Sequence, residues 1–175
     1  MSVIIRNYQK SDYPATVRLF KELSEDYNFN FQEEKWKEES GLRLFSPGYK
    51  RMTLIAEIDG EVVGMGFIEV RAEPTGELMG YLSSWGVAKE YHRRGIGEKL
   101  LGKAVTILSG LNVDAIRLNF SYDVSRNLLE RVSWAGFKPN SILCEKTLTG
   151  SASEILSSEQ EFGESEMVGT KSTQR

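Results

Sequence analysis

A glycine-rich turn joins an apolar, strand-like run to an amphipathic helix in the middle of the chain. The run ends at Val87, glycines stand at Gly95 and Gly97, and Leu100 and Leu101 begin the apolar side of the helix. Glycine lets backbone N–H groups approach a ligand with no side chain in the way. The N–H groups in the first turn of a helix lack intrahelical partners and carry the positive end of its dipole. The turn therefore predicts an anion site that suits phosphate.

The spacing of these glycines excludes two other nucleotide-binding motifs. A dinucleotide fingerprint would need its third glycine where Leu100 stands, and the Gly-Lys-Ser/Thr of a nucleotide P-loop is absent. Another interpretation stays open, in which Gly95 and Gly97 serve only a tight turn and close packing of the helix. Arg93 and Arg94, which stand beside them, favour the anion site.

The composition fits one globular domain with a hydrophobic core. The chain has 175 residues, 40% hydrophobic and 27% charged, and a net charge of -3, which predicts no affinity for nucleic acid or an anionic membrane. No apolar run approaches the roughly 20 residues of a membrane span, and the N-terminus has no signal-peptide pattern. A single cysteine, Cys144, predicts a cytoplasmic protein, and a single histidine, His92, predicts no metal site.

Hydrophobic periodicity predicts an α/β (α+β) fold, with a mixed sheet and helices on both faces. Asp59-Gly60 separates two β-rich runs and predicts a two-residue hairpin turn, because both central positions need a positive φ. Ser11 and Asp12 are candidate N-caps of the first helix. In chain order we expect a strand at 3–7, a helix to Tyr27, and a helix at 31–45 that breaks near Gly41. Strands at 52–58, 61–70 and 78–87, a helix to about Ser109, a strand at 113–120, a helix at 125–134 and a strand at 142–148 follow.

A polar, acidic tail follows the expected domain. We expect the domain to cover residues 1–149 and the tail to cover 150–175, which holds Glu154, Glu159, Glu161, Glu164 and Glu166 against Lys171 and Arg175. A solvated tail is the simpler interpretation. Alternatively, Ser151-Ala-Ser-Glu154 is a capping box for a short helix that carries Ile155, Leu156 and Phe162.

These features resemble the GNAT family of N-acetyltransferases over roughly residues 3–148. The family motif, Arg/Gln-x-x-Gly-x-Gly/Ala, stands here as His92-Arg93-Arg94-Gly95-Ile96-Gly97, five residues after Val87. The Asp59-Gly60 hairpin leads into Val63-Gly64, and Gly136-Phe137 closes the last helix, both as in the family. The resemblance implies a GNAT-like, mostly antiparallel central sheet with splayed central strands. It also implies an N-acetyltransferase that uses acetyl-CoA as co-substrate, without a metal.

The resemblance further implies where acetyl-CoA binds. Its pantetheine amides would pair with the end of the strand, where the N–H of Val87 would polarise the thioester carbonyl. Its phosphates would lie on the glycine turn, with Arg93 and Arg94 as their cations. The residues expected to bind the co-substrate are Trp85, Gly86, Val87, His92, Arg93, Arg94, Gly95, Ile96, Gly97, Glu98 and Ser125.

The sequence departs from the family pattern at the positions expected to transfer protons. The family's tyrosine, five residues before the Phe of Gly-Phe, falls on Val132, and its asparagine falls on Ser125. Many members carry a glutamate base in the strand before Val87, but that stretch here is Ser83-Ser84-Trp85. His92 replaces the first residue of the motif, and a packing or surface role suits it better than catalysis.

Three residues remain as catalytic candidates. Tyr122 offers a phenol to protonate sulfur, Asp123 a carboxylate to relay the amine proton, and Ser84 a hydroxyl to orient water. The alternative is that Tyr122 and Asp123 are loop residues, with Asp123 capping the following helix.

In this family the first two helices form the acceptor side. The segment from Lys21 to Glu39 contains seven carboxylates and three lysines, and this excess of negative charge would favour a cationic amine. Glu–Lys pairs on a solvated face are the alternative. Tyr27, Phe29, Phe31 and Trp36 either line a pocket or pack the helices onto the sheet.

Three functions are compatible with the sequence. The first is an acetyl-CoA-dependent N-acetyltransferase in which a primary amine of a small molecule or peptide attacks the thioester directly. The second is a CoA-binding regulatory or sensory module with weak or no catalysis, which the missing tyrosine favours. The third is an interaction domain that uses the apolar residues of the tail. No nucleic acid or membrane partner is expected, and a homodimer is compatible with the sequence.

Overall fold

The computed structural model describes residues 2–27, 29–44, 50–119, 130 and 132–140. The chain divides into two compact units, Met1–Gly136 and Phe137–Arg175. All the helices, strands and sites described below belong to the first unit. Of the second unit only residues 137–140 are described, and they form no helix or strand. The strand predicted at 142–148 and the tail at 150–175 lie outside the described residues.

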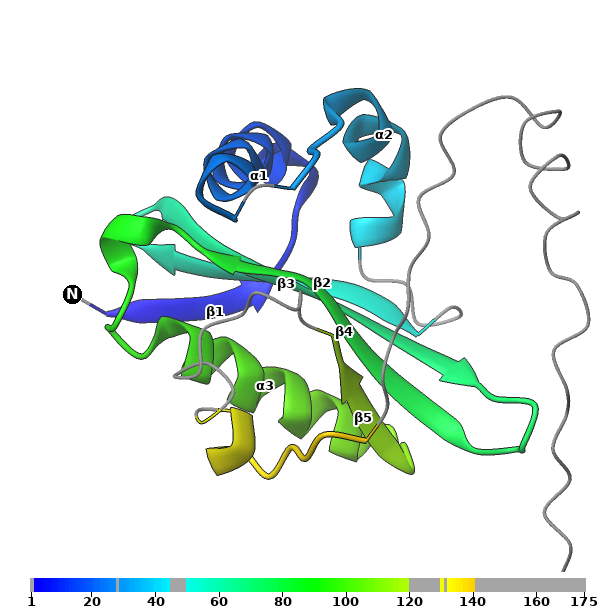
Figure 1. Cartoon of the computed structure of the whole chain (residues 1–175). Coiled ribbons are helices and arrows are strands. Elements are labelled where there is room, and N and C mark those ends of the chain that lie inside the picture. The colour runs from blue at the N-terminus through cyan, green and yellow to red at the C-terminus, as the bar shows by residue number, and fades with distance from the viewer. Residues whose placement is uncertain (1, 28, 45–49, 120–129, 131, 141–175) are drawn as a thin grey trace, which may run out of the picture. The chain divides into compact units, whose positions relative to one another are not determined.

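Five strands form one sheet in the order β1-β2-β3-β4-β5 (Figure 1). Their bounds are β1 Val3–Asn7, β2 Arg51–Ile58, β3 Glu61–Ala72, β4 Leu78–Val87 and β5 Ala115–Leu118. The first four strands pair antiparallel, and β5 runs parallel to β4. The predicted mixed, mostly antiparallel sheet is therefore confirmed.

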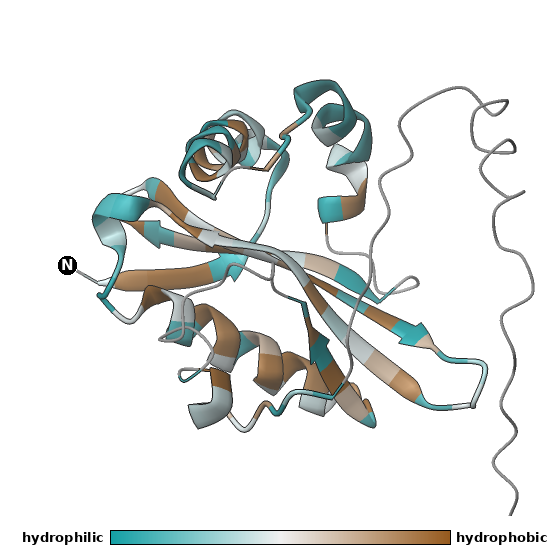
Figure 2. Cartoon of the chain, viewed as in Figure 1, coloured by the Kyte–Doolittle hydropathy of each residue, from teal (hydrophilic) through white to brown (hydrophobic). Residues whose placement is uncertain are grey.

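Helices cover both faces of the sheet, as predicted (Figure 1). α1 Tyr13–Tyr27 and α2 Glu33–Glu38 lie on one face, and α3 Ile96–Gly110 lies on the other. Each long helix buries one side, α1 at Val17, Leu19, Phe20 and Leu23, and α3 at Ile96, Leu100, Ala104 and Leu108. Figure 2 shows the apolar bands along α3 and the strands. Burial of one large aliphatic side chain contributes roughly 1.5–3 kcal/mol, so these rows hold the layers together.

The turns at the sheet ends agree with the sequence. Asp59 and Gly60 have φ of 50° and 85°, the left-handed values that the predicted hairpin requires. β5 begins at Ala115, later than predicted, and Asp114 just before it is hydrogen-bonded to the start of β4. The Asp114 N–H donates to the Leu78 carbonyl at 2.8 Å, and the Asp114 carboxylate accepts from the Leu78 N–H at 2.7 Å.

Within the described ranges, none of the helices has the length and hydrophobicity that crossing a membrane requires.

The second predicted helix, at 31–45, is shorter as an α-helix than predicted, and the break expected near Gly41 falls within a 3₁₀ segment. The α-helix ends at Glu38, and a 3₁₀ helix, η2 Glu39–Arg43, follows it. Arg43 turns inward and donates to the Trp36 carbonyl at 3.0 Å, and its guanidinium lies 3.5 Å from the centre of the Trp36 ring. Because Arg43 takes the inward position, Leu42 is 47% exposed. Tyr27, the last residue of α1, is 63% exposed, so the predicted apolar side of that helix ends at Leu23.

The candidate N-cap Asp12 ties the first strand to the first helical turn. It ends a 3₁₀ helix, η1 Lys10–Asp12, that precedes α1. Its carboxylate accepts from Nη1 and Nη2 of Arg6 at 2.7 and 2.9 Å and from the Gln9 N–H at 2.7 Å. Burial opposes the ionisation of Asp12, but the hydrogen bonds from Arg6 and Gln9 outweigh it, so the pKa of Asp12 lies below its ordinary value.

Replacing Asp12 by Asn is expected to lower the free energy of unfolding at pH 7 by about 2 kcal/mol, because Arg6 loses a hydrogen-bonded counter-charge. The folded-state pKa of Asp12 is depressed, so its stabilisation is present above the unfolded pKa, about 4, and is lost as pH falls through the folded pKa. Urea unfolding should therefore show the gap between wild type and variant closing below about pH 4. A gap that is unchanged from neutral to acidic pH would contradict this role for Asp12.

Candidate functional site

A β-bulge at Ser84 and Trp85 distorts β4 close to its end at Val87. Met65 of β3 pairs with Gly86, and Phe67 pairs with Ser83, so the single residue Gly66 faces both Ser84 and Trp85. Ser84 has a φ of 48°, in the left-handed region that a non-glycine residue rarely adopts. Because a bulge bends a strand and increases its twist, the segment from Ser84 onward takes a new direction.

Two glycines let other side chains reach the backbone around the bulge. A Cβ placed on Gly66 would lie 2.2 Å from Cε3 of Trp85, so the indole ring occupies the space above β3 that a side chain would need. A Cβ on Gly86 would lie 2.2 Å from Cδ1 of Leu23, so α1 packs directly on the end of β4. The bulge is therefore held from both faces of the sheet.

The backbone of Val87 points away from β3. The Ala88 N–H donates to the Val63 carbonyl at 2.8 Å. Antiparallel pairs alternate between hydrogen-bonded and non-hydrogen-bonded, so the neighbouring Gly64–Val87 pair directs the Val87 N–H and carbonyl outward. Among the described residues, β4 pairs with β5 as far as Leu82 and Leu118, and Val87 lies five residues further along β4. The Val87 N–H therefore faces the side of β4 that lies opposite to β3.

His92 contacts the Val87 carbonyl, a contact that the sequence did not predict. Its Nε2 lies 2.7 Å from that oxygen, so Nε2 carries a hydrogen and donates. The side chain is exposed, which agrees with the predicted surface role. The His92 ring links the turn to the end of β4 and uses the Val87 carbonyl as its hydrogen-bond acceptor, next to the outward Val87 N–H.

Three further contacts anchor the turn between β4 and α3. Lys89 pairs with Asp26 of α1 at 2.8 Å, and the Tyr91 hydroxyl donates to Glu61 at 3.0 Å. The hydrogen bond to Glu61 raises the pKa of the Tyr91 phenol, which therefore keeps its proton. The Arg94 guanidinium lies 5.1 Å from the centre of the Tyr91 ring. These contacts fix the position of the turn relative to α1 and β3.

The start of α3 is open to a ligand. Gly95, with a φ of 73°, is the N-cap, and the first intrahelical bond runs from the Lys99 N–H to the Gly95 carbonyl at 3.1 Å. A Cβ on Gly95 or on Gly97 would meet nothing within 4 Å. Among the described residues these glycines therefore do not serve close packing, whereas the positive φ of Gly95 agrees with the tight turn of the alternative interpretation. The side chains of Arg93, Arg94 and Glu98 are exposed, whereas Ile96 is buried beneath them. An exposed helix N-terminus beside two arginines fits a phosphate group.

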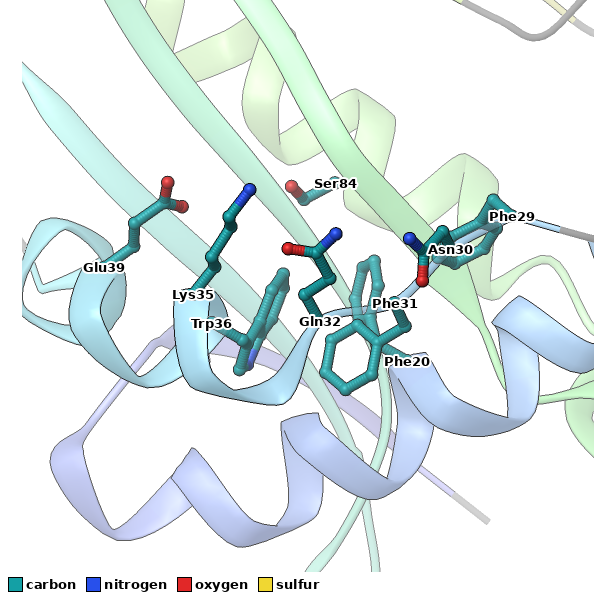
Figure 3. A pocket seen from close by; sticks show the side chains of 9 residues that line it. All are labelled: Phe20, Phe29, Asn30, Phe31, Gln32, Lys35, Trp36, Glu39 and Ser84. Atoms are coloured by element: carbon teal, nitrogen blue, oxygen red, sulfur yellow. The ribbon is translucent and has the colours of Figure 1, made fainter. Parts of the chain in front are cut away.

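A pocket of about 480 Å³ lies between the first two helices and the bulge (Figure 3). Its aromatic lining is Phe20, Phe29, Phe31 and Trp36, and its polar lining is Asn30, Gln32, Lys35, Glu39 and Ser84. Of the four aromatic residues predicted either to line a pocket or to pack the helices, Phe29, Phe31 and Trp36 line the pocket. Tyr27 is not part of the lining. Ser84 belongs to the pocket and to the bulge that precedes Trp85 and Val87.

The carboxylates predicted to form a negative rim are partly paired. Glu33 lies 2.5 Å from Lys21, Asp26 lies 2.8 Å from Lys89, and Glu39 lies 3.8 Å from Arg43. Of the seven carboxylates between Lys21 and Glu39, only Glu39 lines the pocket. Much of the acidic excess therefore lies away from the pocket, on the outer faces of the helices.

The buried carboxylate of the sheet, Glu69, is poorly suited to be a base. It accepts from Arg51 at 2.6 Å and from Arg71 at 2.8 Å, and its neighbour on β4, Tyr81, accepts from Arg117 at 2.8 Å. Burial opposes ionisation of Glu69, but the hydrogen bonds from the two arginines outweigh it and lower its pKa. A carboxylate with a lowered pKa holds a proton weakly at neutral pH, which makes Glu69 a poor base. Its hydrogen bonds with the arginines instead stabilise the pairing of the strands.

The remaining candidates lie at the C-terminal end of the first unit. Tyr122, Asp123 and Ser125 lie outside the described residues, so their roles stay predictions. Val132 is helical and 8% exposed. The helix ends at Trp134, and Gly136, with a φ of 87° and an N–H that donates to the Ser133 carbonyl at 2.9 Å, closes it as the sequence predicted.

Comparison with known proteins places the fold. The family model described as the acetyltransferase (GNAT) family matches residues 16–133. An N-alpha-acetyltransferase of Sulfurisphaera tokodaii is 32% identical over 105 residues, 55% of this chain and 57% of that protein. The match thus spans little more than half of this curated relative.

Solved structures share the same architecture. A transcriptional regulator from Bacillus halodurans superposes with a TM-score of 0.70 at 14% identity, over 84% of this chain and 100% of that one. Glucosamine-6-phosphate N-acetyltransferase from Arabidopsis thaliana superposes with a TM-score of 0.68 at 14% identity, over 85% and 100% of the two chains. A mixed sheet whose bulged central strand feeds a glycine turn and a helix defines an acetyltransferase fold. The chain belongs to the GNAT acetyltransferase family.

Proposed function

We propose that this protein is an acetyl-CoA-dependent N-acetyltransferase that acts in the cytoplasm on a primary amine of a small molecule or peptide. The observation that carries the proposal is the placement of the Val87 N–H. It points outward from a fixed bulge, with the open turn of Gly95 and Gly97 after it and the Ser84 pocket before it. Acyl transfer needs these three parts next to one another: a donor site, an acceptor site and an oxyanion donor between them.

The residues of the chain fit acetyl-CoA as co-substrate. Backbone groups of Trp85, Gly86 and Val87 would bind the pantetheine arm along the side of β4 that faces away from β3. N–H groups at Ile96 and Gly97, with the Arg93 and Arg94 side chains, would bind the phosphates. Acetyl-CoA supplies an activated acyl group, and the protein supplies its orientation and its separation from water.

The proposed reaction is direct transfer. The nitrogen of a neutral amine attacks the thioester carbonyl carbon, a C–N bond forms and the C–S bond breaks. One proton leaves the nitrogen and one reaches the departing thiolate, so free CoA and an N-acetyl amine result. We propose Asp123 as relay for the first proton, Tyr122 as donor of the second and Ser84 as the group that orients water beside the acceptor.

A second candidate is a CoA-binding module with weak or no catalysis. Val132, the residue at the position of the family's tyrosine, is buried at 8% exposure and has no proton to give. A protein of this kind would bind CoA through the same turn but release no thiol.

Thiol release decides between the two. With acetyl-CoA and a panel of primary amines, the enzyme should release free CoA in an amine-dependent way, at least tenfold above the rate without amine. Mass spectrometry of the product amine should show one added acetyl group. Stabilisation by CoA without amine-dependent thiol release would instead support the binding module, because ligand binding raises the apparent stability of the native state without turnover.

A further inference from the structure

The pocket beside Ser84 has an aromatic wall that is ready to receive a ring. Phe20 lies 4.5 Å from Trp36 and Phe31 lies 5.5 Å from Trp36, measured between ring centres. Figure 3 shows these rings gathered at the base of the pocket. Phe29 completes the wall at 6.5 Å from Phe20, edge to face, and is 42% exposed. Burial of an exposed phenyl group by an apolar ligand is favourable, so Phe29 offers a binding surface for such a ligand.

Trp36 is held firmly in this wall. Its ring packs against Phe20 on one side, and the Arg43 guanidinium lies 3.5 Å from its centre. Arg43 also donates to the Trp36 carbonyl at 3.0 Å and is itself 5% exposed. A side chain fixed by packing loses little conformational entropy when a ligand binds, so the wall is preorganised.

The charges of the pocket do not suit a polycation. Lys35 and Glu39 are the two charged residues of the lining, and their formal charges cancel. Figure 3 shows the Lys35 and Gln32 side chains extending toward Ser84, the side on which the acceptor nitrogen must lie. The positive charge of Lys35 repels an amine that carries several positive charges. It does not repel a single amine nitrogen in its neutral form, which is the form that attacks the thioester.

We infer that the acceptor is a primary amine two or three bonds from an aromatic ring, with the ring against Phe29 and Phe31 and the nitrogen directed past Ser84. This inference rests on the proposed function and names its substrate class. The cavity of about 480 Å³ lies in the range of small-molecule sites, and it holds one such group. The same chemistry occurs in a free aralkylamine and in a peptide that begins with phenylalanine.

Rates for matched amines test this assignment. The value of kcat/KM for phenethylamine should exceed that for butylamine and for spermidine by at least about 30-fold, which corresponds to about 2 kcal/mol of ring burial. A peptide that begins with Phe, compared with the same peptide that begins with Gly, shows whether the amine is free or peptide-borne. Calorimetric titration of the CoA-bound protein with the same amines measures the preference without turnover.

Two variants connect the preference to the pocket. Phe29→Ala should raise KM for phenethylamine about tenfold and raise KM for butylamine much less, because the main loss is contact with the substrate ring. Tyr27→Ala is the matched control, an exposed aromatic close in sequence that does not line the pocket, and it should change neither value. Lys35→Glu should shift the preference toward spermidine, since it reverses the charge near the nitrogen.

The outcomes separate this inference from the proposed function. Acetylation of butylamine or spermidine as fast as phenethylamine, or an equal loss for all amines in Phe29→Ala, would overturn the inference and leave the acetyltransferase proposal intact. Absence of acetyl transfer with every amine would contradict the proposed function. In that case, calorimetry that shows no preference for phenethylamine over butylamine would overturn the substrate class as well.

Discussion

Replacing Gly97 by Trp is expected to abolish the stabilisation that CoA gives to the folded protein. CoA at one hundred times its Kd should stabilise the wild type by about 2.7 kcal/mol, a rise in Tm of several degrees. A Cβ at Gly97 meets nothing within 4 Å, so a side chain can leave the backbone there without a clash, and the indole is expected to fill the space where phosphates would lie. Affinity should fall at least about 100-fold, and thermal unfolding with and without CoA measures it directly.

Two variants of the same helix separate loss of the site from loss of the fold. Gly102→Trp places an indole at another exposed glycine of α3 where a Cβ also meets nothing within 4 Å, and it should keep the full shift with CoA. Gly97→Ala should raise the Tm of the free protein, because alanine favours a helix over glycine by up to about 1 kcal/mol. Equal shifts with CoA in wild type and Gly97→Trp would place the phosphates elsewhere.

Local signals predicted most of the fold. The Asp59-Gly60 turn, the β-rich runs of β2 and β3 and the apolar side of α3 each depend on neighbours within a few residues. Errors occurred where a tertiary contact decided the outcome. Arg43 folds back onto Trp36, which converts the end of the second helix into a 3₁₀ helix and exposes Leu42. A long-range stacking contact of this kind has no periodic signature.

The site was predictable only in part for the same reason. The open glycine turn follows from its sequence alone, because glycine type and helix start are local properties. The outward direction of the Val87 N–H depends on the register with β3, and the pocket depends on how α2 meets the bulge. One missed signal was present: Gly64 and Gly66 within a strand indicate a close approach of another group, here the Trp85 ring at Gly66.

That contact predicts a large stability loss on a small substitution. Gly66→Ala is expected to lower the free energy of unfolding by about 2 kcal/mol, because its Cβ would lie 2.2 Å from Cε3 of Trp85 and the rigid indole must move. For a chain of this size the Tm should fall by roughly 5 °C. Since Trp85 belongs to the bulge, the displacement should also move the Val87 N–H and lower kcat at least tenfold in the thiol-release assay.

A double-mutant cycle assigns this loss to the indole. In a Trp85→Ala background the ring is gone, and Gly66→Ala should then be neutral or stabilising by roughly 0.5 kcal/mol, as alanine replaces glycine inside a strand. The coupling between the two positions should therefore be about 2 kcal/mol, measured by urea unfolding of the wild type, both single variants and the double variant. Additive losses would mean that Gly66 is needed for a backbone conformation and not for the ring. Coupling of about 2 kcal/mol would show that the contact between the Trp85 indole and Gly66 stabilises the bulge. The same contact would then position the outward Val87 N–H on which the proposed acyl transfer depends.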